Sequence, residues 1–422
     1  MTAKVDVSTG TGCYKHIMLF FLLVLLSWGA PPGQLPPSQK LSAADARDFT
    51  QELNRVRRLL ATANDKGSVE FQIARTYAAG GQYREAMDWL KKVMDANLGF
   101  DPSRDKLFDP LQHASEFQAL LDQVRIQTPP RSHSRPAAVI QESDVFPENL
   151  AYDAESKMMF LGSTFKHEIV RCSEQRRTCE QFVTAHKSDP GYVLGLKIHQ
   201  PSRTLWATSN TDAGASLHQY ALASGELLGT YAISGAHLFN DLAISSSGEV
   251  FVTDTKEGAV YRIATEDKRL ERVLPDHAFT AANGIALSAN EKTLYVGNFG
   301  DGITAVDLTS RSATPVLHPA NVCLGYIDGL YAIEGSLIAI QNGPMVPRIV
   351  RFDLSADGRA IVDMRILERR NPAFDGITTG TITGSKFLYV ANPQLDKIVN
   401  GKIASGASLA PLRVLSIELG QK

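Results

Sequence analysis

Oxygen-bearing side chains recur at one equivalent position of a repeated sequence pattern. The residues directly before six successive repeat starts are Glu148, Leu194, Asn240, Asn283, Asp328 and Thr379. Two carboxylates crowded at one point repel each other unless a positive charge lies between them. Amide oxygens add neutral ligands, and a set of hard oxygens without His or Cys argues against zinc. We therefore expect Ca²⁺ or another hard divalent cation, with the ligands Glu148, Asn240, Asn283 and Asp328.

The repeats themselves predict the elements that hold these side chains. Each copy reads as a short apolar strand, a polar turn and a second strand, and the copies start at Asn149, Gly195, Asp241, Gly284, Gly329 and Gly380. Intervals of 43 to 51 residues are typical of four-stranded propeller blades. We predict a mainly β protein with a six-bladed β-propeller over residues 137–422. The segments 137–141 and 412–419 are expected to share a blade and close the ring.

Residues 1–30 have the pattern of a signal peptide or an N-terminal anchor. The run from Ile17 to Trp28 is almost wholly apolar, follows Lys4 and Lys15, and precedes small residues and two prolines. It is shorter than the ~20 residues that span a bilayer, and it sits where a signal peptide has its apolar core. We expect a periplasmic or secreted protein, with membrane contact only if this segment is not cleaved.

A small helical domain is predicted over residues 42–126, between linkers at 31–41 and 127–136. The stretch 69–100 has an apolar period of 3.6 residues that Gly80-Gly81 interrupts, which predicts two short antiparallel helices. Its packing positions resemble a tetratricopeptide repeat. One such repeat and a fragment are too few to be stable alone, so we expect the domain to pack on the propeller or on another chain. A protein partner and a structural cap are both open roles.

Charge and cysteine content narrow the class of protein further. The 43 basic and 45 acidic residues contain no basic block, which argues against a nucleic-acid partner. Cys172 and Cys179 bracket a polar turn between two strand-like runs, which favours a disulfide in an exported protein. Cys323 is expected to be a lone buried thiol, and Cys13 precedes the apolar N-terminal run.

The repeats resemble the calcium-dependent lactonases of the regucalcin and gluconolactonase family and, more distantly, the paraoxonases. The matching pieces are FPENLAYD (146–153), HLFNDLAISSSGEVFVTD (237–254), NGIALSANEKTLYVGN (283–298) and IDGLYAIEGSL (327–337). The resemblance implies that Glu148, Asn283 and Asp328 bind the metal and that Asn240 contacts metal or substrate. In the paraoxonase branch, the residue that matches Asp241 helps to hold a second, structural calcium.

Two departures from the family pattern limit what the resemblance implies about substrate. Glu148 is followed by Asn149-Leu150, where the gluconolactonase branch usually has Gly-Pro. That branch often has an Arg two residues before the position of Asn240, and here the residue is Leu238, with His237 beside it. Recognition of a sugar lactone by such an Arg is therefore not expected.

These observations predict an exported metal-dependent hydrolase of a lactone or ester. The cation would polarise the carbonyl and acidify a bound water, with Asp328 as general base. His237 is an alternative proton carrier or a hydrogen-bonded structural residue. The aromatic residues Phe299, Tyr326 and Trp206 line the expected channel mouth or belong to the core. The alternative functions are a non-catalytic, calcium-stabilised binding or scaffolding propeller, and a lyase or carbon–carbon bond-forming reaction at the same site.

Overall fold

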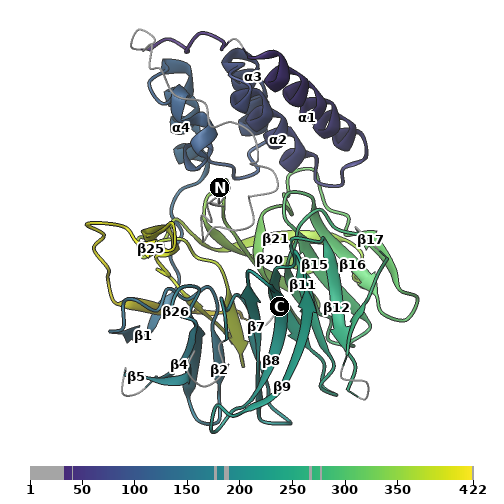
Figure 1. Ribbon diagram of the computed structural model, residues 1–422. Coiled ribbons are helices and arrows are strands. Elements are labelled where there is room, and N and C mark those ends of the chain that lie inside the picture. Colours follow the sequence, from purple (N-terminus) through teal and green to yellow (C-terminus); the bar gives the residue numbers. More distant parts are fainter. Residues whose placement is uncertain are drawn as a thin grey trace, which may run out of the picture.

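The computed structural model describes residues 33–39, 41–174, 178–184, 190–265, 269–275 and 278–420 of the 422-residue chain. Within these ranges helices come first and strands follow, and the helices form a layer above one face of a β-propeller (Figure 1). The predicted signal segment and Cys13 lie outside the described residues. None of the described helices combines the length and apolar character needed to cross a membrane.

The helical module contains four α-helices in the described part of the chain. They are α1 (Ala43–Thr62), α2 (Lys66–Ala79), α3 (Tyr83–Asp95) and α4 (Ser115–Gln127), with 3-10 turns at Pro102–Arg104 and Lys106–Leu111. The break predicted at Gly80-Gly81 is confirmed, because α2 and α3 meet there and Gly81 has a φ of +66°. The resemblance of this helix pair to a tetratricopeptide repeat stays a prediction.

Six four-stranded antiparallel sheets form the propeller in the described residues. Blades one to three contain β2 (Ala151–Asp153), β3 (Met158–Gly162), β4 (Glu168–Ser173), β5 (Cys179–Thr184); β6 (Leu196–His199), β7 (Thr204–Thr211), β8 (Gly214–Ala221), β9 (Leu227–Ser234); and β10 (Phe239–Ile244), β11 (Val250–Asp254), β12 (Ala259–Ile263), β13 (Leu270–Arg272). Blades four to six contain β14 (Ala282–Leu287), β15 (Thr293–Asn298), β16 (Gly302–Asp307), β17 (Ser312–Pro315); β18 (Ile327–Ile333), β19 (Ser336–Gln341), β20 (Arg348–Leu354), β21 (Ile361–Arg369); and β22 (Gly380–Thr383), β23 (Lys386–Val390), β26 (Leu412–Glu418), β1 (Arg135–Ile140). A short hairpin, β24 (Ile398–Val399) and β25 (Lys402–Ile403), lies between β23 and β26. The predicted mainly β fold with six blades is confirmed.

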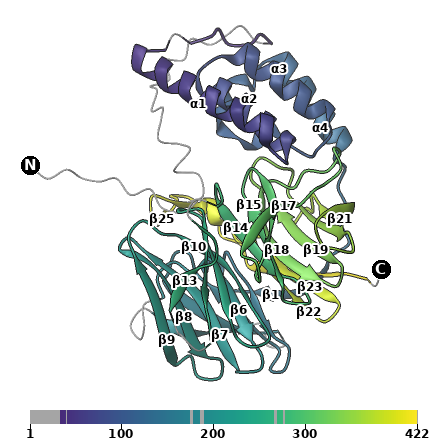
Figure 2. The ribbon, with the colours of Figure 1, turned by 90° about the vertical axis from the view of Figure 1, so that its right-hand side faces the viewer.

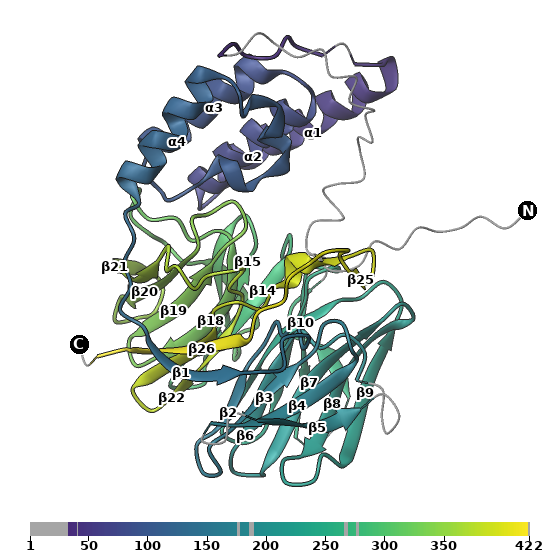
Figure 3. The same cartoon turned by 90° about the vertical axis from the view of Figure 1, so that its left-hand side faces the viewer.

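Blade six closes the ring with strands from distant parts of the chain. β1 pairs antiparallel with β26, so that Ile140 lies opposite Leu412, and Figure 3 shows the two strands side by side. The innermost strands contact one another in the order β2, β6, β10, β14, β18 and β22, and β22 contacts β2 again. The predicted closure by the segments 137–141 and 412–419 is therefore confirmed.

Burial follows the distance of a strand from the axis. The inner strand β10 is buried over nearly its whole length, whereas the outer strand β9 exposes alternate side chains. The outer edge of blade one carries a disulfide between Cys172 on β4 and Cys179 on β5, whose Cα atoms are 4.0 Å apart. This disulfide confirms the predicted pairing, and Cys323 is free and buried as expected.

The helical module and the propeller share one hydrophobic core. Phe71 and Phe100 from the helical region pack together with Tyr326 and Met345 from the loops of blade five. Figure 2 shows the helices above the side of the ring that carries β14 to β19. The expectation that the helical domain packs on the propeller is therefore confirmed.

Candidate metal centre

Three predicted ligands sit at irregularities in the pairing of the inner strands. Asn240, Asn283 and Asp328 are the second residues of β10, β14 and β18. In each strand the register with its neighbour shifts at this point. A β-bulge redirects a side chain relative to a regular strand. An irregularity of the same kind in the strand pairing therefore sets the direction of all three side chains.

Both predicted carboxylate ligands follow a residue with a left-handed backbone. Phe146 has a φ of 50° and precedes Glu148 by two residues, and Tyr326 has a φ of 58° and precedes Asp328 by two residues. A large residue in this conformation costs about 1–3 kcal/mol and persists only where the surroundings hold it. Both aromatic side chains are fully buried, which provides that restraint.

Hydrogen bonds join the candidate ligands of blades three, four and five around the axis. Asn283 Nδ2 donates to Asp328 Oδ1 at 3.1 Å. Asn240 Nδ2 donates to Thr255 Oγ1 at 3.1 Å, and this hydroxyl donates to the Ala282 carbonyl oxygen at 2.5 Å. The structure therefore joins Asn283 directly to Asp328, and it ties Asn240 through Thr255 to the backbone of Ala282, the residue before Asn283.

Asn342 is a site residue that sequence reasoning missed. Its Nδ2 donates to Asp328 Oδ2 at 2.6 Å and to the Ile377 carbonyl oxygen at 2.8 Å. Asn342 lies one residue beyond β19, where the register places Thr255 in blade three and Phe299 in blade four. The residue type changes from blade to blade at this position, so the repeat pattern does not single out Asn342.

Glu148 is tied to blade six through its backbone. The hydroxyls of Thr378 and Thr379 donate to the Glu148 carbonyl oxygen at 2.9 Å and 2.5 Å. Thr379 occupies the sixth of the equivalent positions and so supports a predicted ligand without being one. These contacts join blade one to the segment that leads into the first strand of blade six.

The electrostatics of the axis favour a cation. Burial and repulsion from Asp328 and Asp241 raise the pKa of Glu148 to about 8. Burial also raises the pKa of Asp328 to about 6, although hydrogen bonds from Asn342 and Asn283 oppose the shift. Such shifts mean that the carboxylates are costly to ionise without a positive charge between them. Two carboxylates and two amides therefore fit a hard divalent cation in both charge and ligand type.

A lysine supplies one positive charge within the central channel. Lys197 of β6 places its Nζ 3.8 Å from Asp241 Oδ1 and 4.6 Å from the centre of the Tyr331 ring. Tyr331 belongs to β18, and blades two and five lie opposite each other in the ring, so the lysine crosses the channel. Asp241, to which the resemblance assigns a role in holding a second calcium, is paired with Lys197 in this structure.

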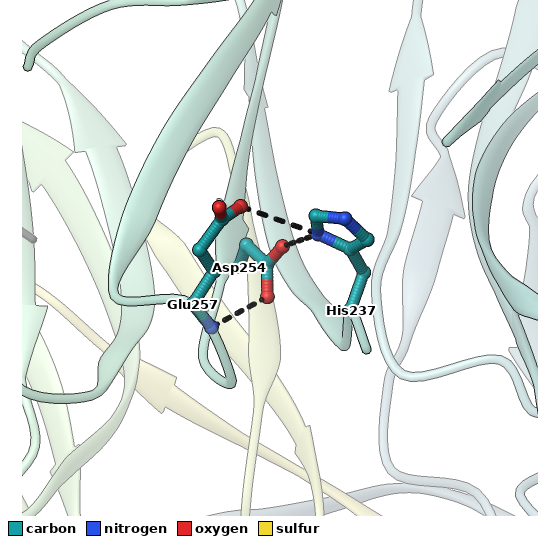
Figure 4. A group of neighbouring side chains, drawn as sticks. All are labelled: His237, Asp254 and Glu257. Atoms are coloured by element: carbon teal, nitrogen blue, oxygen red, sulfur yellow. Dashed lines mark hydrogen bonds and ion pairs between the residues drawn. The ribbon is translucent and has the colours of Figure 1, made fainter. Parts of the chain in front are cut away.

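His237 belongs to a separate cluster on blade three, which Figure 4 shows. Its Nδ1 lies 2.5 Å from Asp254 Oδ2 and 3.3 Å from Glu257 Oε2, and its ring packs edge-on against Tyr261. Tyr261 lies on β12, the third strand from the axis, so the imidazole is directed outward along the blade. Three ligand atoms of this cluster lie within 4.8 Å of one another. Glu257 also pairs with Arg272 and accepts a hydrogen bond from Tyr261, so neighbouring residues of blade three supply partners to this cluster.

The aromatic residues expected at the channel mouth lie elsewhere. Trp206 is buried between blades two and three and stacks on Tyr231 with 5.5 Å between ring centres. Tyr326 is buried beneath the helical module, and the partly buried Phe299 packs edge-on against it. Of the two interpretations of these side chains, the core alternative is confirmed for Trp206 and Tyr326, because contacts between blades and with the helices bury them.

Fold and site together define the chain as a six-bladed propeller with oxygen-bearing side chains gathered at its axis. No family model matches the chain. The lactonase drp35 of Staphylococcus aureus is 24% identical over 157 residues, which cover 35% of this chain and 47% of that protein. The chain therefore matches about half the length of its curated relatives. This match confirms the predicted resemblance to the lactonase family.

Two solved structures are similar to the propeller. The allergen Mala s 1 of Malassezia sympodialis has a TM-score of 0.53 and 15% identity, and the match covers 68% of this chain and 96% of that one. A gluconolactonase of Xanthomonas campestris has a TM-score of 0.47 and 15% identity, and the match covers 68% of this chain and 98% of that one. The likeness to Mala s 1 shows the fold alone.

Proposed function

We propose that the protein is a metal-dependent hydrolase of a lactone or ester. What supports this proposal is that Asn240, Asn283 and Asp328 occupy the same position of three adjacent inner strands, that Asn283 donates to Asp328, and that the Glu148 carboxylate lies near enough to be repelled by Asp328. The raised pKa values of Glu148 and Asp328 support a cation at this point. The name of the curated relative, a lactonase, supports a lactone as the substrate class.

The proposed cation is Ca²⁺, with Glu148, Asn240, Asn283 and Asp328 as its protein ligands. Calcium takes about 6–8 oxygen atoms and accepts irregular geometry, so four side chains leave places for water and substrate. When bound, it would supply Lewis acidity to a carbonyl oxygen and lower the pKa of a nearby water.

Asp328 is the proposed general base of the reaction. Asn283 and Asn342 donate to its two carboxylate oxygens from either side, so its carboxylate plane is held in one direction. A general base needs this kind of fixed geometry more than any other property. His237 remains an alternative proton carrier, with Asp254 holding its ring.

We also propose that the protein is exported. The disulfide between Cys172 and Cys179 supports this location, because structural disulfides persist mainly in oxidising compartments. The apolar run Ile17–Trp28 would direct the export.

The test is hydrolysis of a panel of lactones and aryl esters by the full chain. Each substrate is assayed with added Ca²⁺, after chelation, and with the variants Asp328→Asn and His237→Gln. His199→Gln is the matched control, since His199 is a buried, hydrogen-bonded histidine near the other end of its inner strand. We expect a loss of about 10²–10⁴-fold in kcat for Asp328→Asn, the usual contribution of a general base, and no comparable loss for His199→Gln.

The outcomes separate the candidate functions. If His237→Gln is as damaging as Asp328→Asn, the histidine takes part in proton transfer. If Ca²⁺ raises the melting temperature but no substrate is turned over, the calcium-stabilised binding propeller replaces the hydrolase. If neither binding nor hydrolysis responds to Ca²⁺ or to Asp328→Asn, the axial site is not a metal centre.

A further inference from the structure

The carboxylate of Asp65 joins the helical module to the propeller. Its Oδ1 accepts a hydrogen bond from Ser68 N at 3.0 Å, which caps α2. Its Oδ2 accepts hydrogen bonds from Leu324 N at 2.5 Å and from Gly325 N at 2.8 Å. Asp65 is 1% exposed, and hydrogen bonds to an ionised acceptor are about twice as strong as neutral ones. One side chain therefore fixes the loop 322–326 against the first turn of α2.

The loop 322–326 packs against α2 without space for a side chain at Gly325. A Cβ atom at Gly325 would lie 2.0 Å from Ser68 Oγ, so only glycine permits the observed approach. Ser68 Oγ also lies 3.5 Å from Cys323 Sγ. The loop therefore cannot keep its position if α2 moves.

The same loop ends in the left-handed residue that precedes Asp328. The ring of Tyr326 packs edge-on against Phe71 and Phe100 of the helical region, with ring centres 6.5 Å and 5.7 Å apart. These contacts help to restrain a backbone conformation that costs about 1–3 kcal/mol. At the other carboxylate ligand, Phe146 is restrained from within the propeller by Phe165 at 5.6 Å.

The loop that carries Asn342 is held from the same side. Asn342 donates to Asp328 Oδ2, and three residues later Met345 forms an antiparallel bridge with Phe100 of the helical region. Two backbone hydrogen bonds of 2.8 Å flank this bridge. Two chain segments that position the Asp328 carboxylate, the loop 322–326 and the loop that carries Asn342, are therefore anchored to the helical module, whereas Asn283 reaches it from β14.

We propose that the helical module contributes to metal binding at the propeller axis. Asp65 is the positioning residue that couples the helical module to the metal ligand Asp328. The proposal rests on the metal site proposed above. Docking of α2 holds the loop 322–326 and so holds Asp328 in its ligand geometry. Coupling between two sites is reciprocal, so metal binding also tightens the docking of the helices.

The test compares Asp65→Asn with Ser42→Ala in the full chain. Asn caps a helix as well as Asp does, so Asp65→Asn keeps the cap of α2 but loses the charged acceptor for Leu324 and Gly325. Ser42 is exposed and caps α1 through Asp45, so Ser42→Ala removes a cap of the same module away from the interface. Calcium affinity is measured by titration calorimetry, and amide exchange is measured with and without calcium.

We expect the Kd for Ca²⁺ to rise about tenfold in Asp65→Asn, within the usual range of coupling between sites, and to stay unchanged in Ser42→Ala. In the wild type, calcium should slow exchange of the Leu324 and Gly325 amides by a similar factor, and the variant should lose this protection. Gly325→Ala, which pushes on Ser68, should weaken calcium binding in the same direction.

The measured calcium affinities separate failure of the coupling from failure of the metal centre. Equal calcium affinity in the wild type and Asp65→Asn overturns the coupling but leaves the metal centre intact. An equal loss in Ser42→Ala overturns it as well, because the effect would then be general destabilisation. A wild type that binds no calcium overturns the metal centre itself, and the coupling with it.

Discussion

Lys197→Met is the substitution that most directly tests the charge balance of the channel. Methionine keeps an apolar stem against Tyr331 but removes the ammonium beside Asp241. Two unit charges 3.8 Å apart attract by about 4 kcal/mol at an effective dielectric constant of about 20. Removing one partner of a buried pair costs ~3–5 kcal/mol. Because 21% of the Lys197 side chain is exposed, we expect the lower end, a loss of about 3 kcal/mol in metal-free protein.

The size of this loss should depend on pH. Burial raises the pKa of Asp241, and Lys197 opposes that shift, so its removal raises the pKa further. An acid with a raised pKa in the folded state favours folding while protonated, and this contribution disappears as the pH rises through the folded pKa. The loss in Lys197→Met should therefore be larger at pH 8 than at pH 5.

The assay is urea denaturation of chelator-treated protein at both pH values. Lys386→Met is the matched control, because Lys386 lies 3.6 Å from Glu418 with both side chains more than half exposed. We expect this surface pair to contribute at most ~1 kcal/mol. The double variant Lys197→Met/Asp241→Asn should regain much of the lost stability. The reasoning is refuted if Lys197→Met is no less stable than Lys386→Met at pH 8, or if the double variant recovers nothing.

Two further predictions concern the metal and the disulfide. Calcium must displace protons from Glu148 and Asp328, so its association constant should rise about tenfold per pH unit between pH 6 and pH 8. The metal-free protein should lose stability as the pH rises through the same range, and calorimetric titrations that show a flat affinity profile would contradict this. Replacing both Cys172 and Cys179 by Ser opens a short loop and should cost about 2–3 kcal/mol in denaturation. A loss below ~0.5 kcal/mol, the ordinary effect of a surface substitution, would refute a stabilising role.

The propeller was predictable because its blades repeat. Each blade carries its own strand and turn signals, and the regular interval between copies revealed both the number of blades and the equivalent positions before their inner strands. Closure by β1 and β26 was predictable because a propeller ring must close, and strand-like segments lie before the first repeat and after the last one. The disulfide followed from a hairpin that places Cys172 opposite Cys179. These features depend on contacts between sequence neighbours or between equivalent positions.

The remaining features depend on contacts that no local pattern contains. Lys197 and Tyr331 occupy equivalent repeat positions at which three other copies have alanine, but only the closed ring shows that they meet across the channel. Tyr326, two residues before Asp328, was a candidate for the channel mouth or for the core. The helical module covers it, and nothing in the repeat anticipates that contact.

The pairing of β1 with β26 also determines when the molecule can finish folding. β26 inserts between β23 and β1, and it emerges from the ribosome after every other described strand. Until β26 has been synthesised, blade six lacks one strand, and β1 has no partner strand while the first five blades are made. Contacts between such distant segments form slowly, because the loop must close before they stabilise anything. If the chain is exported as proposed above, this order keeps the ring open until β26 has been translocated.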